Sequence, residues 1–264
     1  MKAKVKQILL WSVTVILALA LFSFVNQRRK NALCTSVKVE FTGNPELQFV
    51  GKEDVLDLLY SKGFRIEQVA VGSINLMEIE KELTRHPAIK STEAFFTSGN
   101  VLNIRVQKRE PVLRVIDSSG ESYYLDEDGE YMPLQDSYTA RVPVASGVIM
   151  EKMPGVTMKE IMQSDSLQKV CILDDLYMIA SAARRDTFIW AQMEQLNVLP
   201  DREIELIPAI GPGKVLLGDA SGISDKFNRF SLFYKEGLPK AGWNTYSSIN
   251  LKFNNQIICT QNTY

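Results

Sequence analysis

Residues 8–25 read ILLWSVTVILALALFSFV and carry no formal charge. As a helix, a stretch of this length spans about 27 Å, which is close to the hydrocarbon thickness of a bilayer. A single segment inside hydrocarbon satisfies its own backbone hydrogen bonds only as a helix, so this stretch predicts a transmembrane helix. The rest of the chain is then expected to be a folded body held at a membrane surface.

Two other interpretations of residues 8–25 are weaker. A buried core helix is rarely placed at the start of a chain between two basic clusters. A cleaved signal peptide normally has a shorter apolar core followed by a small-residue cleavage site, and residues 24–30 (FVNQRRK) contain no such site. We therefore expect an uncleaved anchor, with residues 1–7 as a short tail and residues 26–36 as a juxtamembrane linker. Three basic residues lie on each side of the anchor, so charge alone does not decide its orientation.

Charge and cysteine content exclude several classes of protein. The chain has 264 residues and a formal net charge of −1, with acidic and basic residues interspersed, so it has no basic footprint for nucleic acid. Cys34, Cys171 and Cys259 are too widely spaced for a zinc ligand set or a dense disulfide framework. Buried free thiols are the simplest interpretation, and one disulfide in an oxidising compartment is the alternative that stays open.

Residues 37–109 have the pattern of a small, independent α+β unit. The expected order is a strand from Val37 to Phe41, a helix over 52–62, a helix from Asn75, and strands over 89–97 and 101–108. Asn75 and Glu78 have the spacing of a capping box, and Pro87 ends the second helix. Two helices are therefore expected on one face of a small mixed sheet.

Residues 110–264 predict a second α+β unit, which Glu110 and Pro111 separate from the first. The expected strands lie over 112–116, 122–125, 141–145, 188–198, 203–207, 214–217, 247–253 and 256–261. One helix is expected after a capping box formed by Thr157 and Glu160, and another from Ser224 to Glu236 that ends at Gly237. Asn254 and Asn255 tolerate left-handed backbone and are expected to turn the last hairpin.

A search for catalytic, metal-binding or cofactor-binding residues finds none. The chain has one histidine, His86, which stands before a proline at a helix end. A Ser-His-Asp or Cys-His catalytic site would therefore have to include His86. Residues 211–214 (GPGK) lack the upstream glycine and the following hydroxyl of a phosphate loop, because Pro208 and Val215 occupy those places. Asp126 and Asp128 resemble the start of a calcium loop, but Ser137 stands where its glutamate is required. We therefore expect a chain that is not an enzyme.

The last predicted strand, residues 256–261, is expected to lie at the edge of its sheet because the chain ends soon after it. An edge strand has unpaired N–H and C=O groups, to which a partner strand can add. A strand paired on both sides is the alternative.

Six short segments carry a resemblance to a known family. They are 106–111 (VQKREP), 123–129 (YYLDEDG), 141–147 (RVPVASG), 190–196 (WAQMEQL), 214–218 (KVLLG) and 249–253 (INLKF). In their order and spacing they resemble the bacterial cell-division family FtsQ, called DivIB in some bacteria. Residues 37–109 resemble a POTRA domain, and residues 110–264 resemble the β domain of that family. Near the end, Asn250, Leu251, Lys252 and Phe253 stand where many members have an acidic residue, an apolar residue, arginine and tyrosine.

This resemblance implies a location, a role and a contact surface. The N-terminus would be cytoplasmic and the body periplasmic, in an inner-membrane protein at the division septum. The protein would be a non-enzymatic scaffold that binds the FtsB (DivIC) and FtsL proteins by strand addition, and its POTRA-like unit would serve other division partners. The implied contact residues are Lys252, Phe253, Asn255, Ile257, Ile258, Cys259 and Gln261.

Two rival functions are kept open. A POTRA-bearing component of polypeptide transport or envelope assembly would be expected to have further POTRA units or a β-barrel, and the chain has one unit and too few residues for a barrel. A membrane-anchored envelope enzyme would need a nucleophile or metal cluster that the sequence does not reveal.

Overall fold

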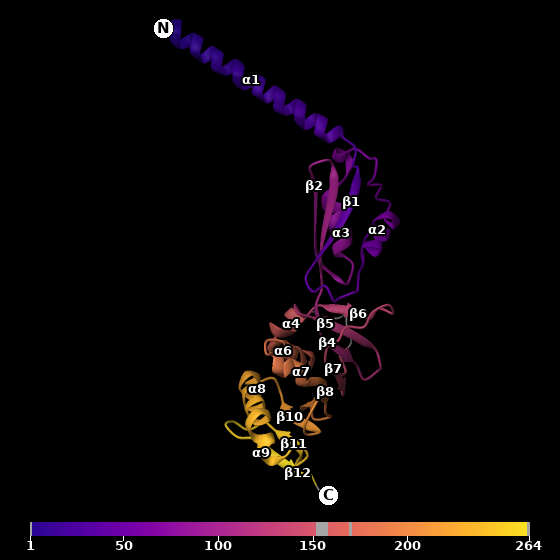
Figure 1. The fold of residues 1–264 in the computed structure, drawn as a ribbon, viewed down its shortest axis with the longest axis vertical. Coiled ribbons are helices and arrows are strands. Elements are labelled where there is room, and N and C mark those ends of the chain that lie inside the picture. Colours follow the sequence, from indigo (N-terminus) through magenta and orange to yellow (C-terminus); the bar gives the residue numbers. More distant parts are fainter. Residues whose placement is uncertain (1, 152–157, 169–170, 263–264) are drawn as a thin grey trace. The chain divides into compact units, whose positions relative to one another are not determined.

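The computed structural model describes residues 2–151, 158–168 and 171–262. The chain divides into two compact units, Met1–Lys108 and Arg109–Tyr264, which are described separately. Figure 1 gives the element labels used below. Thr157, the predicted capping residue of a helix in the second unit, lies outside the described residues.

The first unit begins with the apolar helix. Its elements are α1 (Lys2–Asn31), β1 (Ser36–Thr42), α2 (Lys52–Ser61), the short 3₁₀ helix η1 (Val71–Ser73), α3 (Leu76–Thr84), β2 (Ile89–Thr97) and β3 (Val101–Lys108). Within the described residues, one helix is long and apolar enough to cross a membrane, and its most apolar window is Trp11–Arg28. Helix α1 therefore contains the predicted anchor and extends beyond it at both ends.

The POTRA-like part of this unit is a mixed sheet in the order β1-β3-β2 with two helices. β1 runs parallel to β3, and β2 runs antiparallel to it. Val55, Leu59, Ile79 and Leu83 from the two helices pack on Ile104 and its neighbours in the sheet. The predicted cap is confirmed, because the Asn75 side chain accepts a hydrogen bond from the Glu78 N–H.

The second unit contains a larger mixed sheet and a layer of helices. Its elements are β4 (Pro111–Ile116), β5 (Ser122–Asp126), β6 (Tyr131–Pro133), β7 (Val144–Gly147), α4 (Met158–Met162), α5 (Asp165–Gln168), α6 (Leu173–Ala183), α7 (Thr187–Gln192), β8 (Met193–Val198), β9 (Ile204–Pro208), β10 (Lys214–Gly218), α8 (Ile223–Leu232), the π-helical turn η2 (Phe233–Gly237), α9 (Leu238–Ala241), β11 (Tyr246–Asn250) and β12 (Ile258–Gln261). Over the described residues the sheet has nine strands, in the order β12-β11-β10-β9-β8-β7-β4-β5-β6. Figure 1 shows the helices of this unit gathered beside the strands. Their apolar faces form one core with the sheet around Leu176, Leu206 and Phe230.

Two predictions about secondary structure were wrong in this unit. The stretch 188–198 was expected to be one strand, but helix α7 occupies its first part and β8 begins at Met193. The Asp186 carboxylate caps α7 by accepting the N–H groups of Phe188 and Ile189, which overrides the β preference of the aromatic residues. The helix expected to end at Gly237 continues beyond it as α9. Leu238, the first residue of α9, is fully buried, and its packing in the core favours the continued helix.

Gly147 fixes the end of the short strand β7. Its φ is +103°, and a Cβ on it would lie 2.2 Å from the carbonyl oxygen of Val198, its partner in β8. A distance that short is a severe overlap with backbone, so only glycine lets β7 and β8 approach this closely.

Asp126 is buried and serves the fold. Its carboxylate accepts the N–H groups of Asp128 and Glu130 at 2.9 and 2.7 Å, and it also pairs with the Arg109 guanidinium at 2.7 Å. The Asp126 carboxylate, which stands where a calcium loop would begin, therefore closes a tight turn.

Candidate partner-binding edge

Strand β12 lies at the edge of the large sheet, as its position in the chain predicted. It pairs antiparallel with β11, with Ser248 opposite Thr260 and Ile249 opposite Cys259. No other strand in the described part of the chain pairs with its second side. β11 in turn lies parallel to β10, so the 27-residue connection 219–245, with its helices, crosses over between them.

Two hydrogen bonds show which backbone groups of β12 face outward. The Leu251 N–H donates to Leu216 in β10, so the backbone groups of Ile249 also face β10 and those of Ser248 face β12. Thr260, which lies opposite Ser248, must therefore face inward. The Asn262 N–H donates to Thr245, which gives the same alternation. Between these inward-facing residues, the N–H and C=O groups of Cys259 and the N–H of Gln261 face away from β11, whereas the Gln261 carbonyl accepts a hydrogen bond from the Ser247 hydroxyl of β11 at 3.5 Å.

The side chains of the β12 segment divide between two faces. Ile257 and Cys259 are partly buried against the core shared with the helices. Ile258 is 45% exposed, and Thr260 and Gln261 are also exposed. Burial raises the pKa of the Cys259 thiol above its usual value, so this thiol is neutral at pH 7 and a poor nucleophile. The edge thus offers hydrogen-bonding groups and apolar surface, and it has no reactive group.

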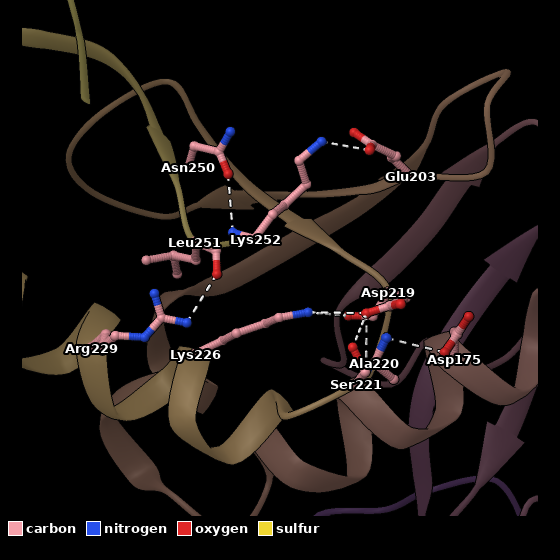
Figure 2. A network of polar contacts seen from close by, with 10 residues as sticks. All are labelled: Asp175, Glu203, Asp219, Ala220, Ser221, Lys226, Arg229, Asn250, Leu251 and Lys252. Carbon is pink, nitrogen blue, oxygen red and sulfur yellow. Dashed lines mark hydrogen bonds and ion pairs between the residues drawn. The ribbon is translucent and has the colours of Figure 1, made fainter. Parts of the chain in front are cut away.

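The loop between β11 and β12 is shaped by its polar side chains (Figure 2). Asn255 has a φ of +59°, as its predicted place in a turn requires. The Asn250 side chain accepts the Lys252 N–H at 3.0 Å, and the Lys252 ammonium pairs with Glu203 at 2.5 Å. Lys252 is therefore turned toward the strand β9 region, while Phe253 is 45% exposed in the loop.

The seven residues implied by the resemblance all lie in one continuous segment, the loop and the edge strand. Lys252, Phe253 and Asn255 are in the loop, Ile257 is just before β12, and the other three are in β12. One contact was missed from the sequence. The guanidinium of Arg229, in helix α8, donates to the carbonyl groups of Leu251, Phe253 and Gln256. Arg229 precedes these three residues by 22 to 27 positions, and no pattern in the sequence indicates that it contacts them.

A second polar network lies where β10 leads into α8 (Figure 2). The buried Lys226 ammonium donates to the Asp219 carbonyl and carboxylate at 2.9 and 3.1 Å. Hydrogen bonds from Ser221 and from Lys226 lower the pKa of the Asp219 carboxyl. Burial raises the pKa of neighbouring Asp175, whose carboxylate accepts the Ala220 N–H at 3.0 Å. These contacts fix the start of α8, the helix that carries Arg229.

The described residues contain no group of three or more His, Cys, Asp and Glu side chains placed to hold a metal ion. His86 Nδ1 accepts the Ala88 N–H at 3.3 Å, and burial lowers the pKa of its imidazole. The histidine is therefore a neutral group at a helix end.

The folds of the two units are those of an α+β protein with a POTRA-like domain and a large sheet, and strand β12 at one edge of that sheet is unpaired on its outer side among the described residues. Residues 32–107 match the model of the POTRA-like domain. Residues 110–260 match the model described as FtsQ/DivIB, C-terminal related, so the chain belongs to this family of cell-division proteins. It is also 28% identical over 196 residues to the cell division protein FtsQ of Salinibacter ruber (strain DSM 13855 / M31), a match that covers 72% of this chain and 71% of that protein.

Proposed function

We propose that the chain is a non-enzymatic scaffold of the division machinery, anchored in the inner membrane by α1. Its N-terminus would lie in the cytoplasm, and its POTRA-like part and its second unit would lie in the periplasm at the septum. In this proposal it binds FtsB/DivIC-like and FtsL-like proteins, while the POTRA-like unit serves other division partners. Family membership supports the role in division, and the bare edge of β12 supports the binding mode.

The proposed binding mode is the addition of a partner strand beside β12. The outward N–H and C=O groups of Cys259 and the outward N–H of Gln261 would pair with the partner backbone and supply affinity. The side chains of a strand alternate between two faces, so Ile258 would contact one face of the partner strand and Ile257 the other. Exposed Phe253 in the adjoining loop would add apolar contact at the end of the interface.

Photocrosslinking in dividing cells tests this proposal. A crosslinking residue is placed at Gln261 or Ile258 of the full chain, since both side chains are exposed and their replacement leaves the core intact. The matched control is Met150, which is 74% exposed in the same unit and is not part of β12. Capture of FtsB/DivIC-like or FtsL-like protein from both edge positions, and not from Met150, supports strand addition.

Two results would overturn the proposal. Equal capture from Met150 and from the edge positions would show that binding does not use β12. Capture of an unfolded outer-membrane polypeptide in place of a division protein would favour a role in envelope assembly. Orientation is tested separately by fusing a reporter that is active only in the periplasm to residue 262, where we expect activity.

A further inference from the structure

We propose that Arg229 is a positioning residue for partner binding, which holds β12 in the geometry that a partner strand requires. This inference rests on the proposed function. Arg229 lies in α8 and is not part of the edge strand, so its effect would pass through the loop 251–257. The residues needed for partner binding would then include one that need not touch the partner.

The guanidinium of Arg229 uses both of its terminal nitrogens on the loop. Nη1 donates to the carbonyl groups of Phe253 and Gln256 at 2.8 and 2.6 Å, and Nη2 donates to that of Leu251 at 2.9 Å. Nε donates to the Asp225 carboxylate at 2.9 Å, one helical turn earlier. The Arg229 side chain is only 13% exposed, so water competes little for these hydrogen bonds.

Three backbone carbonyls converge on one cation because of the conformation of the loop. The left-handed backbone at Asn255 reverses the chain between Phe253 and Gln256 and leaves both of their oxygens on the Arg229 side. Carbonyl oxygens brought together repel one another unless a donor lies between them. A planar guanidinium reaches all three from fixed directions, whereas the single nitrogen of lysine cannot span the same set.

The position of this loop determines where β12 begins. Gln256 is two residues before Ile258, the first residue of the strand, and Leu251 directly follows β11. Arg229 therefore ties down the two chain segments that enter and leave the hairpin turn. Because a binding edge that is already ordered loses less conformational entropy on association, the clamp would favour partner binding.

Hydrogen exchange on the full chain in detergent micelles, without any partner, tests the clamp itself. In R229Q, and in R229K because lysine lacks the fork, we expect the inward-facing amides of Ile258 and Thr260 to exchange about 10- to 100-fold faster. The control D225N removes the carboxylate and keeps the three carbonyl bonds, so exchange should stay within about twofold. The Leu206 amide, in the interior strand β9, should not change in any variant, which shows that unfolding is local.

Photocrosslinking from position 261 then tests the role in binding. We expect R229Q and R229K to reduce capture of the FtsB/DivIC-like or FtsL-like protein about tenfold at equal protein level, and D225N to leave it unchanged. Unaltered exchange in R229Q overturns the clamp. Faster exchange with undiminished capture shows that Arg229 stabilises the loop without serving binding, and it overturns the positioning role. If the otherwise unmodified chain captures no division protein, the proposed function fails, and the exchange result still decides whether Arg229 holds the edge.

Discussion

A pair of proline substitutions at neighbouring positions tests the register of the binding edge. Gln261 and Thr260 are both exposed, but the N–H of Gln261 faces away from β11 and that of Thr260 faces Ser248. Proline has no N–H and is tolerated in a strand where that group faces solvent. Q261P should therefore remove a group that only a partner uses, and T260P should remove a bond within the fold.

The expected magnitudes follow from these hydrogen bonds. Q261P should change the free energy of unfolding by less than about 0.5 kcal/mol. In the complex it leaves a partner carbonyl unpaired at a cost of about 1 to 3 kcal/mol, which corresponds to about 5- to 140-fold weaker binding. T260P leaves the carbonyl group of Ser248 unpaired, a residue only 8% exposed, and should cost the fold about 1 to 3 kcal/mol.

Two assays on the full chain in detergent separate the two effects. Denaturant unfolding measures the stability of each variant, and titration with the purified FtsB/DivIC-like protein measures its Kd. Q261A and T260A are the controls, because each removes the same exposed side chain and keeps the N–H. If Q261P binds as tightly as Q261A, or if Q261P rather than T260P lowers the free energy of unfolding, the inward and outward directions assigned to the β12 backbone are wrong.

Three further predictions concern carboxylates of the second unit, each measured by denaturant unfolding. Asp174 is 5% exposed and its Oδ1 finds no hydrogen-bond partner among the described residues, and burial raises the pKa of this carboxyl. An acid whose pKa is raised in the folded state stabilises the fold at low pH and loses that contribution as the pH rises through the folded pKa. D174N should therefore increase stability at pH 7 and reduce the fall in stability above pH 4, and a D174N variant with unchanged pH dependence would contradict this. D126A leaves the Arg109 guanidinium without its carboxylate and should cost about 3 to 5 kcal/mol, with D128A as a control expected to cost far less. E203Q breaks an ion pair with Lys252 whose two side chains are about one-third exposed, so it should cost less than about 1 kcal/mol and nothing at about 1 M salt; a larger, salt-insensitive loss would refute this estimate.

Local signals in the sequence were sufficient for much of the fold. Alternation in residues 37–41 and the cap at Asn75 predicted the order of the POTRA-like unit, and the position of the last segment predicted an edge strand. Helix α7 was missed because its aromatic and β-branched residues favour a strand, and only the capping carboxylate of Asp186 indicates a helix. The β propensity of these residues favoured a strand, whereas the Asp186 cap favoured a helix. The helix formed because the cap and the burial of Ile189 outweighed the propensity.

The features of the binding edge that depend on distant residues could not be predicted. The contact between Arg229 and three carbonyls exists only because the crossover between β10 and β11 carries α8 to the loop. Likewise, the direction of each N–H in β12 depends on which residue of β11 lies opposite it, and no periodicity in the sequence records that register. The seven implied contact residues came from the family resemblance, and binding by them stays a prediction.

The crowding at Gly147 has a consequence for genetics. Even alanine there would push β7 from β8 in the middle of the sheet, so a screen for loss of division should recover substitutions at this position although it lies outside β12 and its loop. Such alleles should be temperature-sensitive and should be rescued by lowering the growth temperature, whereas alleles at the edge should be equally defective at every temperature. The thermal behaviour of a mutant would thus distinguish damage to the framework from damage to the contact.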